Sequence, residues 1–176
     1  MDVQSLLIGK HILLTMNRIW ISEELVDTII TEIVSYAPLE TGGAFFGYQA
    51  ENNDIVITHL ISSGPKAKHK KFSFEPDQEY QLSQMEIIYY ENEGRLSYLG
   101  DWHSHPVSSP LLSRRDEKTL LNIAFSESAK CSRPLMIIFG SLPEKWSVNA
   151  VRFSEGMKYF GPFYKCKYES LLLVVD

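Results

Sequence analysis

The sequence has 176 residues, of which 44% are hydrophobic and 22% carry a formal charge. These values are ordinary for a globular protein, and the length is sufficient for one domain with a sizeable core. The formal net charge of -5 argues against a nucleic-acid-binding protein as a first hypothesis.

Three features of the sequence predict a cytoplasmic protein. The short apolar run Leu6–Ile8 lacks a preceding basic region, so no signal peptide is expected. No apolar run approaches the roughly 20 residues that a membrane helix needs. Cys131 and Cys166 lie far apart and form no C-x-x-C pair, which favours free thiols in a reducing compartment.

The first elements along the chain lead towards a glutamate. Residues 1–20 predict one or two short strands or an N-terminal arm. Ser22 is a favoured helix cap, and apolar residues at helical spacing then predict a helix over 22–36. The helix is expected to stop before Pro38, to lie against a sheet and to deliver the chain to Glu40.

Next come a hairpin and a basic run. Residues 43–48 and 54–62 predict two strands joined by a turn, with His59 as a structural side chain. The basic run, residues 66–71, is either a solvated loop or a contact for an acidic part of a substrate. In the second case Lys68, Lys70 and Lys71 would bind that part.

The second half of the chain alternates helices and strands. Residues 72–74 form a short extended piece, and the stripe Tyr80, Met85, Ile88 and Tyr89 predicts a helix that ends near Gly94. The remaining predicted elements are a strand over 95–105, a helix over 114–130, a strand over 134–139, a loop over 140–145 and a strand over 146–153. The apolar tail, residues 154–176, is expected to pad the core or a dimer contact.

Two histidines stand at the end of the strand over 95–105. His103 and His105 are two residues apart, so both side chains point to the same face of an extended strand. Pro106 is expected to end the strand directly after them. Trp102, before the first histidine, is expected to be core or pocket wall. Asp116 falls in the first turn of the next helix, from which its carboxylate can turn back towards the imidazoles.

Two imidazole nitrogens and one carboxylate oxygen form a zinc ligand set with one tetrahedral position open. Such a site can lower the pKa of bound water to roughly 7 and generate a hydroxide nucleophile. The reaction also needs a general base. Glu40 is the candidate, because it precedes Gly42 and Gly43, which permit close approach of the backbone at the start of a strand.

These residues together resemble the JAMM motif of the JAB/MPN metalloprotease family. That motif is an upstream Glu, then H-[S/T]-H-P, a gap of seven residues, Ser, and Asp three positions later. The sequence fills every position with Glu40, His103–Pro106, Ser113 and Asp116. The resemblance extends from about residue 19 to residue 153.

The resemblance implies an α/β fold of the JAB/MPN, cytidine deaminase-like type. This is one α-β-α domain over residues 1–176 with a mixed curved sheet, whose N-terminal arm and C-terminal tail pack on a core of about 19–153. It implies one zinc ion per chain on His103, His105 and Asp116, with Glu40 as general acid/base and Ser113 steadying the oxyanion.

The family further implies a substrate. It is an isopeptide or peptide bond after the tail of ubiquitin or a ubiquitin-like protein, cleaved in deconjugation or precursor processing. A small member of this kind resembles prokaryotic enzymes, including those in antiphage operons. One alternative is a peptidase that trims a sulfur-carrier precursor or cuts cell-wall peptides.

Two alternatives remain open from the residues. Ser113–Asp116 also has the pattern of a helix capping box, which would occupy the serine hydroxyl without any catalytic role. The same fold can also serve as a non-catalytic scaffold that binds a ubiquitin-like partner. Scaffolds of that kind have lost motif positions, and this sequence retains them all. No nucleic acid and no membrane are expected as partners, and a homodimer stays open.

Overall fold

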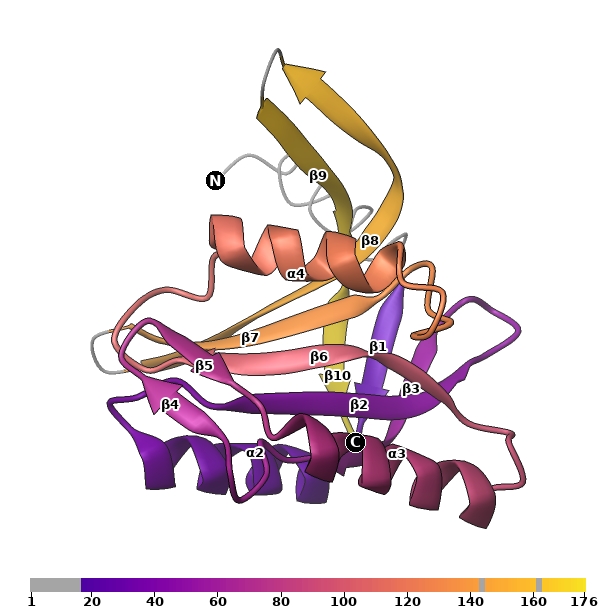
Figure 1. The fold of residues 1–176 in the computed structure, drawn as a ribbon, viewed down its shortest axis with the longest axis horizontal. Coiled ribbons are helices and arrows are strands. Elements are labelled where there is room, and N and C mark those ends of the chain that lie inside the picture. Colours follow the sequence, from indigo (N-terminus) through magenta and orange to yellow (C-terminus); the bar gives the residue numbers. More distant parts are fainter. Residues whose placement is uncertain (1–16, 143–144, 161–162) are drawn as a thin grey trace, which may run out of the picture.

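An eight-stranded mixed sheet forms the centre of the molecule (Figure 1). The computed structural model describes residues 17–142, 145–160 and 163–176. The strands, in their order across the sheet, are β10 (Leu172–Val175), β1 (Arg18–Ile21), β3 (Ile55–Ile61), β2 (Gly42–Gln49), β6 (Ser97–His105), β7 (Leu135–Leu142), β8 (Lys145–Phe160) and β9 (Phe163–Ser170).

Three helices and a small second sheet complete the described chain. The helices are α2 (Glu23–Tyr36), α3 (Gln78–Glu91) and α4 (Arg114–Ala124), and the second sheet is the hairpin of β4 (Lys68–Lys70) and β5 (Ser73–Glu75). In the large sheet, β1 runs parallel to β3 and to β10, and β6 runs parallel to β7. The other neighbours are antiparallel, so the predicted mixed α/β sheet is confirmed.

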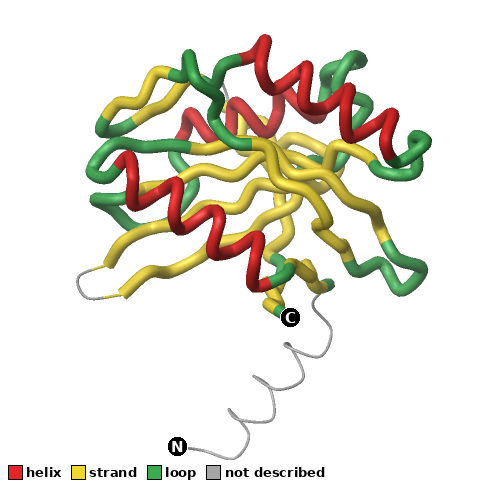
Figure 2. Tube along the Cα trace, turned by 90° about the horizontal axis from the view of Figure 1, so that it is seen from below, coloured by secondary structure: helices red, strands yellow, loops and turns green. Residues whose placement is uncertain are grey.

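The helices cover both faces of this sheet (Figure 2). Ile29 and Ile33 of α2 pack with Phe45 of β2 and Ile137 of β7. Their neighbours along β2 and β7, which point to the opposite face, pack instead against α3 and α4. The layers are therefore α2 on one face of the sheet, the sheet itself, and α3 and α4 on the opposite face.

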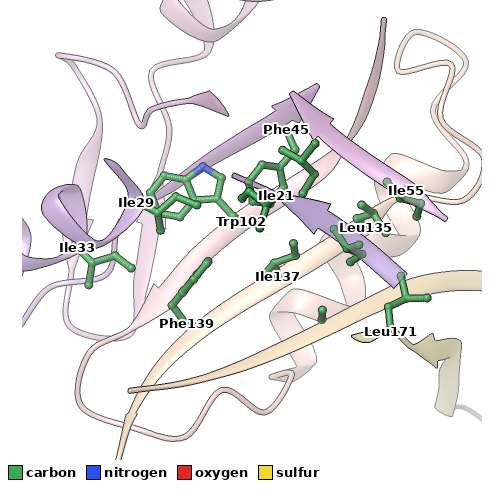
Figure 3. Close-up of a cluster of buried hydrophobic side chains, with 13 residues drawn as sticks. Ile21, Ile29, Ile33, Phe45, Ile55, Trp102, Leu135, Ile137, Phe139 and Leu171 are labelled. Atoms are coloured by element: carbon green, nitrogen blue, oxygen red, sulfur yellow. The ribbon is translucent and has the colours of Figure 1, made fainter. Parts of the chain in front are cut away.

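The largest hydrophobic cluster lies between α2 and the sheet (Figure 3). Trp102 of β6 is fully buried there, with its ring edge-on to Phe139 at a centroid distance of 6.4 Å. Its indole Nε1 donates to the carbonyl of Ile61 at 3.3 Å. The tryptophan that precedes the histidine pair therefore anchors the end of β6 in the core.

Side-chain caps fix where the helices begin. Ser22, Asp77 and Ser113 each accept a hydrogen bond from a backbone N–H in the first turn of α2, α3 and α4. The predicted helix over 114–130 is too long, because α4 ends at Ala124. The Ser126 hydroxyl there accepts from the Ala129 N–H, which stabilises a turn instead of further helix.

The basic run is not simply a solvated loop. Residues 68–70 form β4, which pairs with β5 in register from Lys68–Glu75 to Lys70–Ser73. Alternation along β4 leaves both lysines exposed and turns His69 inwards. The prediction missed this strand because three charged or polar residues in a row give no apolar alternation to detect.

The predictions for the second half also differ in extent. The expected loop over 140–145 is in part strand, since β7 continues to Leu142 and pairs with β8. The apolar stripe expected to face the core from α3 does not include Tyr89, which is 54% exposed. The predicted strands or arm of residues 1–16 lie outside the described residues, and β1 begins at Arg18.

The apolar tail forms strands at both edges of the sheet. β9 pairs with the long β8, and β10 then pairs with β1 at the other end of the strand order. Leu171, between them, is buried in the cluster beneath α2. The tail therefore completes the core, as one of its two predicted roles requires. None of the described helices is long and apolar enough to cross a membrane.

Candidate metal centre

Both histidines lie at the carboxyl end of β6, on the face covered by α3 and α4. His103 stands opposite Gly42 of β2 and Ile138 of β7, and His105 stands opposite Gly140. Strand alternation directs the two imidazoles to one side and Trp102 and Ser104 to the other, as the H-x-H spacing predicts. Both imidazoles are buried, with 6% and 7% of each residue exposed.

Ser104, between the histidines, holds the segment that carries Glu40. The Ser104 N–H donates to the Thr41 carbonyl at 2.8 Å, and the Ser104 hydroxyl accepts from the Thr41 N–H at 3.1 Å. The Thr41 hydroxyl donates to the Glu32 carboxylate of α2 at 2.8 Å. The residue after Glu40 is therefore fixed to both the histidine strand and α2.

The first turn of α4 supplies the carboxylate. Ser113 and Asp116 form the predicted capping box: the Asp116 N–H donates to the Ser113 hydroxyl at 3.2 Å, and the Ser113 N–H donates to Asp116 Oδ2 at 2.7 Å. This second bond holds the carboxylate back over the helix end. Its other oxygen, Oδ1, then lies 3.3 Å from Nε2 of His103.

The three side chains converge on one point. The Nε2 atoms of His103 and His105 are 3.2 Å apart, and one ligand atom from each of His103, His105 and Asp116 lies within 4.8 Å of the others. Two ligand atoms about 2.0–2.1 Å from a tetrahedral ion are roughly 3.3 Å apart. The residues present therefore fit a metal ion of that size without rearrangement of the backbone.

The outer nitrogen of His105 selects the tautomer that metal binding requires. Its Nδ1 lies 3.0 Å from the Ser109 carbonyl oxygen, which can only accept a hydrogen bond. Nδ1 is therefore the protonated nitrogen, and the Nε2 lone pair is directed to the cluster. Burial lowers the pKa of His105, which favours the neutral imidazole that a metal needs.

The Asp116 carboxylate stays ionised. Burial alone would raise its pKa, but hydrogen bonds from His103 and from Ser113, together with the charge of His103, lower the pKa to about 2. The group therefore presents a negative charge to the cluster at any ordinary pH. Metal binding requires both histidines in the neutral form, and one anionic and two neutral ligands then leave a divalent ion with a net positive charge.

Glu40 lies beside the three ligands without joining them. Its Oε1 is 3.9 Å from Nε2 of His105, and only 8% of the residue is exposed. Burial, together with the smaller effect of the Asp116 charge, raises the pKa of Glu40 to about 7 against the opposing effects of His103 and Arg115. A carboxyl group with a pKa near neutrality can both take up and release a proton during a reaction.

A cavity of about 200 Å³ opens above the cluster. Glu40, Ser113 and the three ligands line it, so the structure brings together all five residues that the sequence singled out for chemistry. Part of its wall comes from the β4–β5 hairpin through Phe72, Ser73 and Phe74. Phe72 is 69% exposed, at the rim of the cavity.

None of the three lysines predicted to contact substrate is among the residues that line this cavity. Lys68 and Lys70 form ion pairs with Glu75, at 3.2 and 3.5 Å, on the exposed side of the hairpin. Lys71 instead extends over the ring of Phe72, 5.3 Å from its centroid. The side chains of Lys68 and Lys70 are thus directed to Glu75, and the side chain of Lys71 lies against the cavity-lining Phe72.

Several residues that lie near the cluster were not identified from the sequence. Asp101, Arg115 and Thr119 line the cavity, and Asp101 accepts a 2.6 Å hydrogen bond from the Tyr98 hydroxyl. Asp101 shares the face of His103 by strand alternation, which the spacing could have revealed. The nearby His69 could not be found in this way, because it reaches Glu40 only through the fold.

The other candidate residues are structural. His59 lies away from the cluster, with Nδ1 2.9 Å from the Thr58 hydroxyl. Cys131 and Cys166 are both free, as predicted. Burial raises the pKa of each thiol to about 11, so neither is activated as a nucleophile.

Comparison with known proteins agrees with this geometry. A family model described as prokaryotic homologues of the JAB domain matches residues 22–154. A protein named "Probable metalloprotease y4qB", from Sinorhizobium fredii, is 38% identical over 134 residues, which are 75% of this chain and 81% of the relative.

Two further sets of relatives extend the comparison. A "CD-NTase/cGAS isopeptidase" from Enterobacter hormaechei is 26% identical over 70% of this chain and 67% of its own length. A protein with the same name from Escherichia coli is 27% identical over 48% of this chain and 53% of its own length. The solution structure of protein DSY2949 from Desulfitobacterium hafniense shares the fold, with a TM-score of 0.65, 15% identity, and coverage of 90% of this chain and 92% of that one.

Proposed function

Because this chain belongs to the family of prokaryotic homologues of the JAB domain, a family of metalloproteases and isopeptidases, we propose that it cleaves the amide bond after the C-terminal tail of a ubiquitin-like protein. We further propose one zinc ion per chain as the cofactor. The observation that carries the proposal is the convergence of His103, His105 and Asp116 beside a buried Glu40 with a pKa near 7.

Each residue has a defined part in this reaction. When bound, the ion would polarise the scissile carbonyl and acidify water. Glu40 takes a proton from the attacking water as the new C–O bond forms at the carbonyl carbon. It then gives that proton to the leaving nitrogen as the C–N bond breaks, so the carboxylate is regenerated. Phe72 and Phe74 give the cavity wall beside these groups an apolar surface.

Ser113 can serve the cap and the reaction together. In the capping box its oxygen accepts a hydrogen bond, which uses a lone pair and leaves the hydroxyl hydrogen free. We propose that this hydrogen is donated to the oxyanion that develops on the substrate carbonyl. The Ser113 hydroxyl can therefore cap the helix and stabilise the oxyanion at the same time.

The substrate is proposed from the relatives. Two of them are named "CD-NTase/cGAS isopeptidase", and an isopeptidase cleaves the amide bond of a conjugated protein. We propose that this chain removes a ubiquitin-like protein from an amine of a conjugate of that kind, in a prokaryotic cytoplasm and in an antiphage role.

The first experiment measures metal content and cleavage in parallel. Native protein, His105→Ala and Glu40→Gln are assayed for zinc by mass spectrometry and for hydrolysis of ubiquitin with an amide-linked coumarin at its C-terminus. We expect about one zinc per chain in the native protein and in Glu40→Gln, and little in His105→Ala. Both variants should lose turnover, by about 10²-fold or more for Glu40→Gln.

Two variants of Ser113 complete this panel. Ser113→Gly should keep the cap to within a few tenths of a kcal/mol but lower kcat by about 10²-fold. Ser113→Thr, which restores a hydroxyl, should retain most of the activity. Cleavage that survives complete removal of metal, or a Glu40→Gln variant with normal kcat, would contradict the proposed reaction. Zinc binding without any cleavage of tail-linked substrates would instead favour a scaffold that binds a ubiquitin-like partner.

A further inference from the structure

The backbone of Glu40 is held by the β4–β5 hairpin. The Glu40 N–H donates to the Lys70 carbonyl at 2.8 Å, and the Glu40 carbonyl lies 2.9 Å from Nδ1 of His69. Since a carbonyl oxygen only accepts, Nδ1 of His69 carries the hydrogen. Both polar groups of the Glu40 peptide backbone are thus bonded to adjacent residues of one short strand.

His69 is itself fixed in place. Its ring stacks on Tyr36 of α2, with centroids 3.7 Å apart and planes 16° from parallel. The stack leaves the ring little freedom to turn Nδ1 away from Glu40. His69 therefore connects the end of α2, the hairpin and the segment that carries the proposed general base.

The hairpin also contacts the other side of this segment. The Phe74 ring of β5 packs so closely on Gly42 that a Cβ there would lie 2.6 Å from the ring. Phe74 and Phe72 line the cavity above the cluster. The same hairpin thus touches the space for the substrate and supports Glu40 from both ends.

We infer that His69 is a positioning residue for Glu40, which acts through the hydrogen bond from its Nδ1 to the Glu40 carbonyl. This inference rests on the proposed function of Glu40 as the general base. A misplacement of about 1 Å at a reacting group can cost about 10²-fold in rate, so a single bond that fixes the Glu40 backbone can matter to turnover. His69 itself touches neither the ligand cluster nor the reacting atoms.

Three variants separate the hydrogen bond from the other contacts of this residue. His69→Phe keeps a ring on Tyr36 but has no donor. His69→Asn loses the ring but presents a side-chain N–H close to the position of Nδ1. His59→Phe makes the same change at a strand histidine that lies away from the cluster, and it serves as the matched control.

Two measurements are made on the zinc-loaded protein. The first is kcat and KM for the coumarin-linked ubiquitin. The second is hydrogen–deuterium exchange of the peptide that contains the Glu40 N–H, which needs no substrate. For His69→Phe we expect a kcat at least tenfold lower, a KM within about twofold, unchanged zinc content, and faster exchange at Glu40. His69→Asn should retain most of the native kcat and protection, and His59→Phe should match the native protein.

The outcomes are distinguishable. Unchanged exchange at Glu40 in His69→Phe would overturn the inference, and so would equal losses of kcat in the Phe and Asn variants. A rise in KM with normal kcat would also overturn it, because the hairpin would then act only on substrate binding. If the native protein cleaves no tail-linked substrate, the proposed function fails, while faster exchange in His69→Phe but not in His69→Asn would still support the structural link to Glu40.

Discussion

Glu40 occupies a position that costs the folded protein stability. Its carboxyl group is buried beside Asp116, and the pKa of about 7 lies well above the ordinary value of 4.5. A carboxylate with a raised pKa prefers its neutral form, so the folded state is penalised wherever the group must ionise. A metal ion in the neighbouring cluster would offset this penalty with its positive charge.

The penalty predicts a pH-dependent gain in stability for Glu40→Gln. The folded state binds the Glu40 proton more tightly than the unfolded state does, so wild-type stability falls as pH rises from about 4.5 to about 7. In metal-free protein at pH 8, the variant should therefore exceed wild type by about 1–3 kcal/mol in free energy of unfolding. Urea unfolding at pH 8 and pH 5 measures this.

The difference between variant and wild type should shrink at pH 5, where Glu40 is protonated in the folded state. The control is Glu79→Gln, at an exposed glutamate of α3 that pairs with Lys66. Its free energy of unfolding should differ from that of wild type by the same amount at both pH values. An equal gain for Glu40→Gln at both pH values would show that ionisation of this carboxyl group is not the cause.

At the scale of single residues, the sequence predicted the cluster because its parts are local. The H-x-H spacing fixes both imidazoles on one face of a strand, and the S-x-x-D spacing turns Asp116 back over the start of a helix. Glu40 was proposed from its position before Gly42 and Gly43 at the start of a strand, and the family resemblance implied the same role. Its distance from His105 depends on the pairing of β2 with β6, which no local pattern encodes.

Among the secondary-structure elements, the β4–β5 hairpin determines which lysines of the basic run can contact a substrate. Its outward lysines, Lys68 and Lys70, are paired with Glu75 and are 71% and 61% exposed at the side chain. Exposed pairs of this kind contribute little to stability. Lys71, at the turn beside Phe72, has its charge close to the cavity rim.

The hairpin geometry narrows the predicted substrate contact to one lysine. If an acidic part of the substrate lies along the hairpin, Lys71→Glu should raise KM severalfold with little change in kcat, because uniform binding is lost. The effect should weaken as salt is added, since exposed charges are screened. Steady-state kinetics at low and at high ionic strength measure both effects.

Lys66→Glu is the comparison within the same basic run. Lys66 is paired with Glu79 and does not line the cavity. Unaltered kinetics for Lys71→Glu at low salt would remove the basic run from the substrate contacts. A similar rise in KM for both variants would point to a general effect of net charge and not to a contact at the rim.

At the scale of the whole molecule, the order of the strands across the sheet could not be predicted from the sequence. The local sequence pattern correctly predicted α2, β2, β3 and β7, each of which is encoded within one short segment. It did not predict that β9 and β10 would join opposite ends of the strand order, because that depends on pairings between distant segments. The end of α4 was missed for a similar reason, since Ser126 stabilises a turn through its side chain.

A substitution at Leu171 tests how far the stability of the sheet depends on the segment that connects β9 at one edge to β10 at the other. Its side chain is 6% exposed and packs in the cluster beneath α2, where the chain passes from β9 to β10. Leu171→Ala should lower the free energy of unfolding by about 2–5 kcal/mol through lost burial and a residual cavity. Val175→Ala, at an exposed position of β10, should cost less than about 1 kcal/mol.

Both variants are compared by urea unfolding of the zinc-loaded protein, with zinc content measured in each. If Leu171→Ala lowers the free energy of unfolding no more than Val175→Ala does, the packing of the β9–β10 connection does not stabilise the sheet. Zinc content should stay unchanged in both, because Leu171 lies on the face of the sheet away from the histidines.

The pairing of β1 with β10 has a consequence for biosynthesis. β1 is the first strand of the described chain to leave the ribosome, and β10 is the last. Until β10 emerges, β1 has a neighbour on only one side and exposes an edge to other nascent chains. Contacts of such long sequence separation also form slowly. The sheet edge can therefore close only after translation has passed β10, and aggregation during synthesis is the hazard this topology carries.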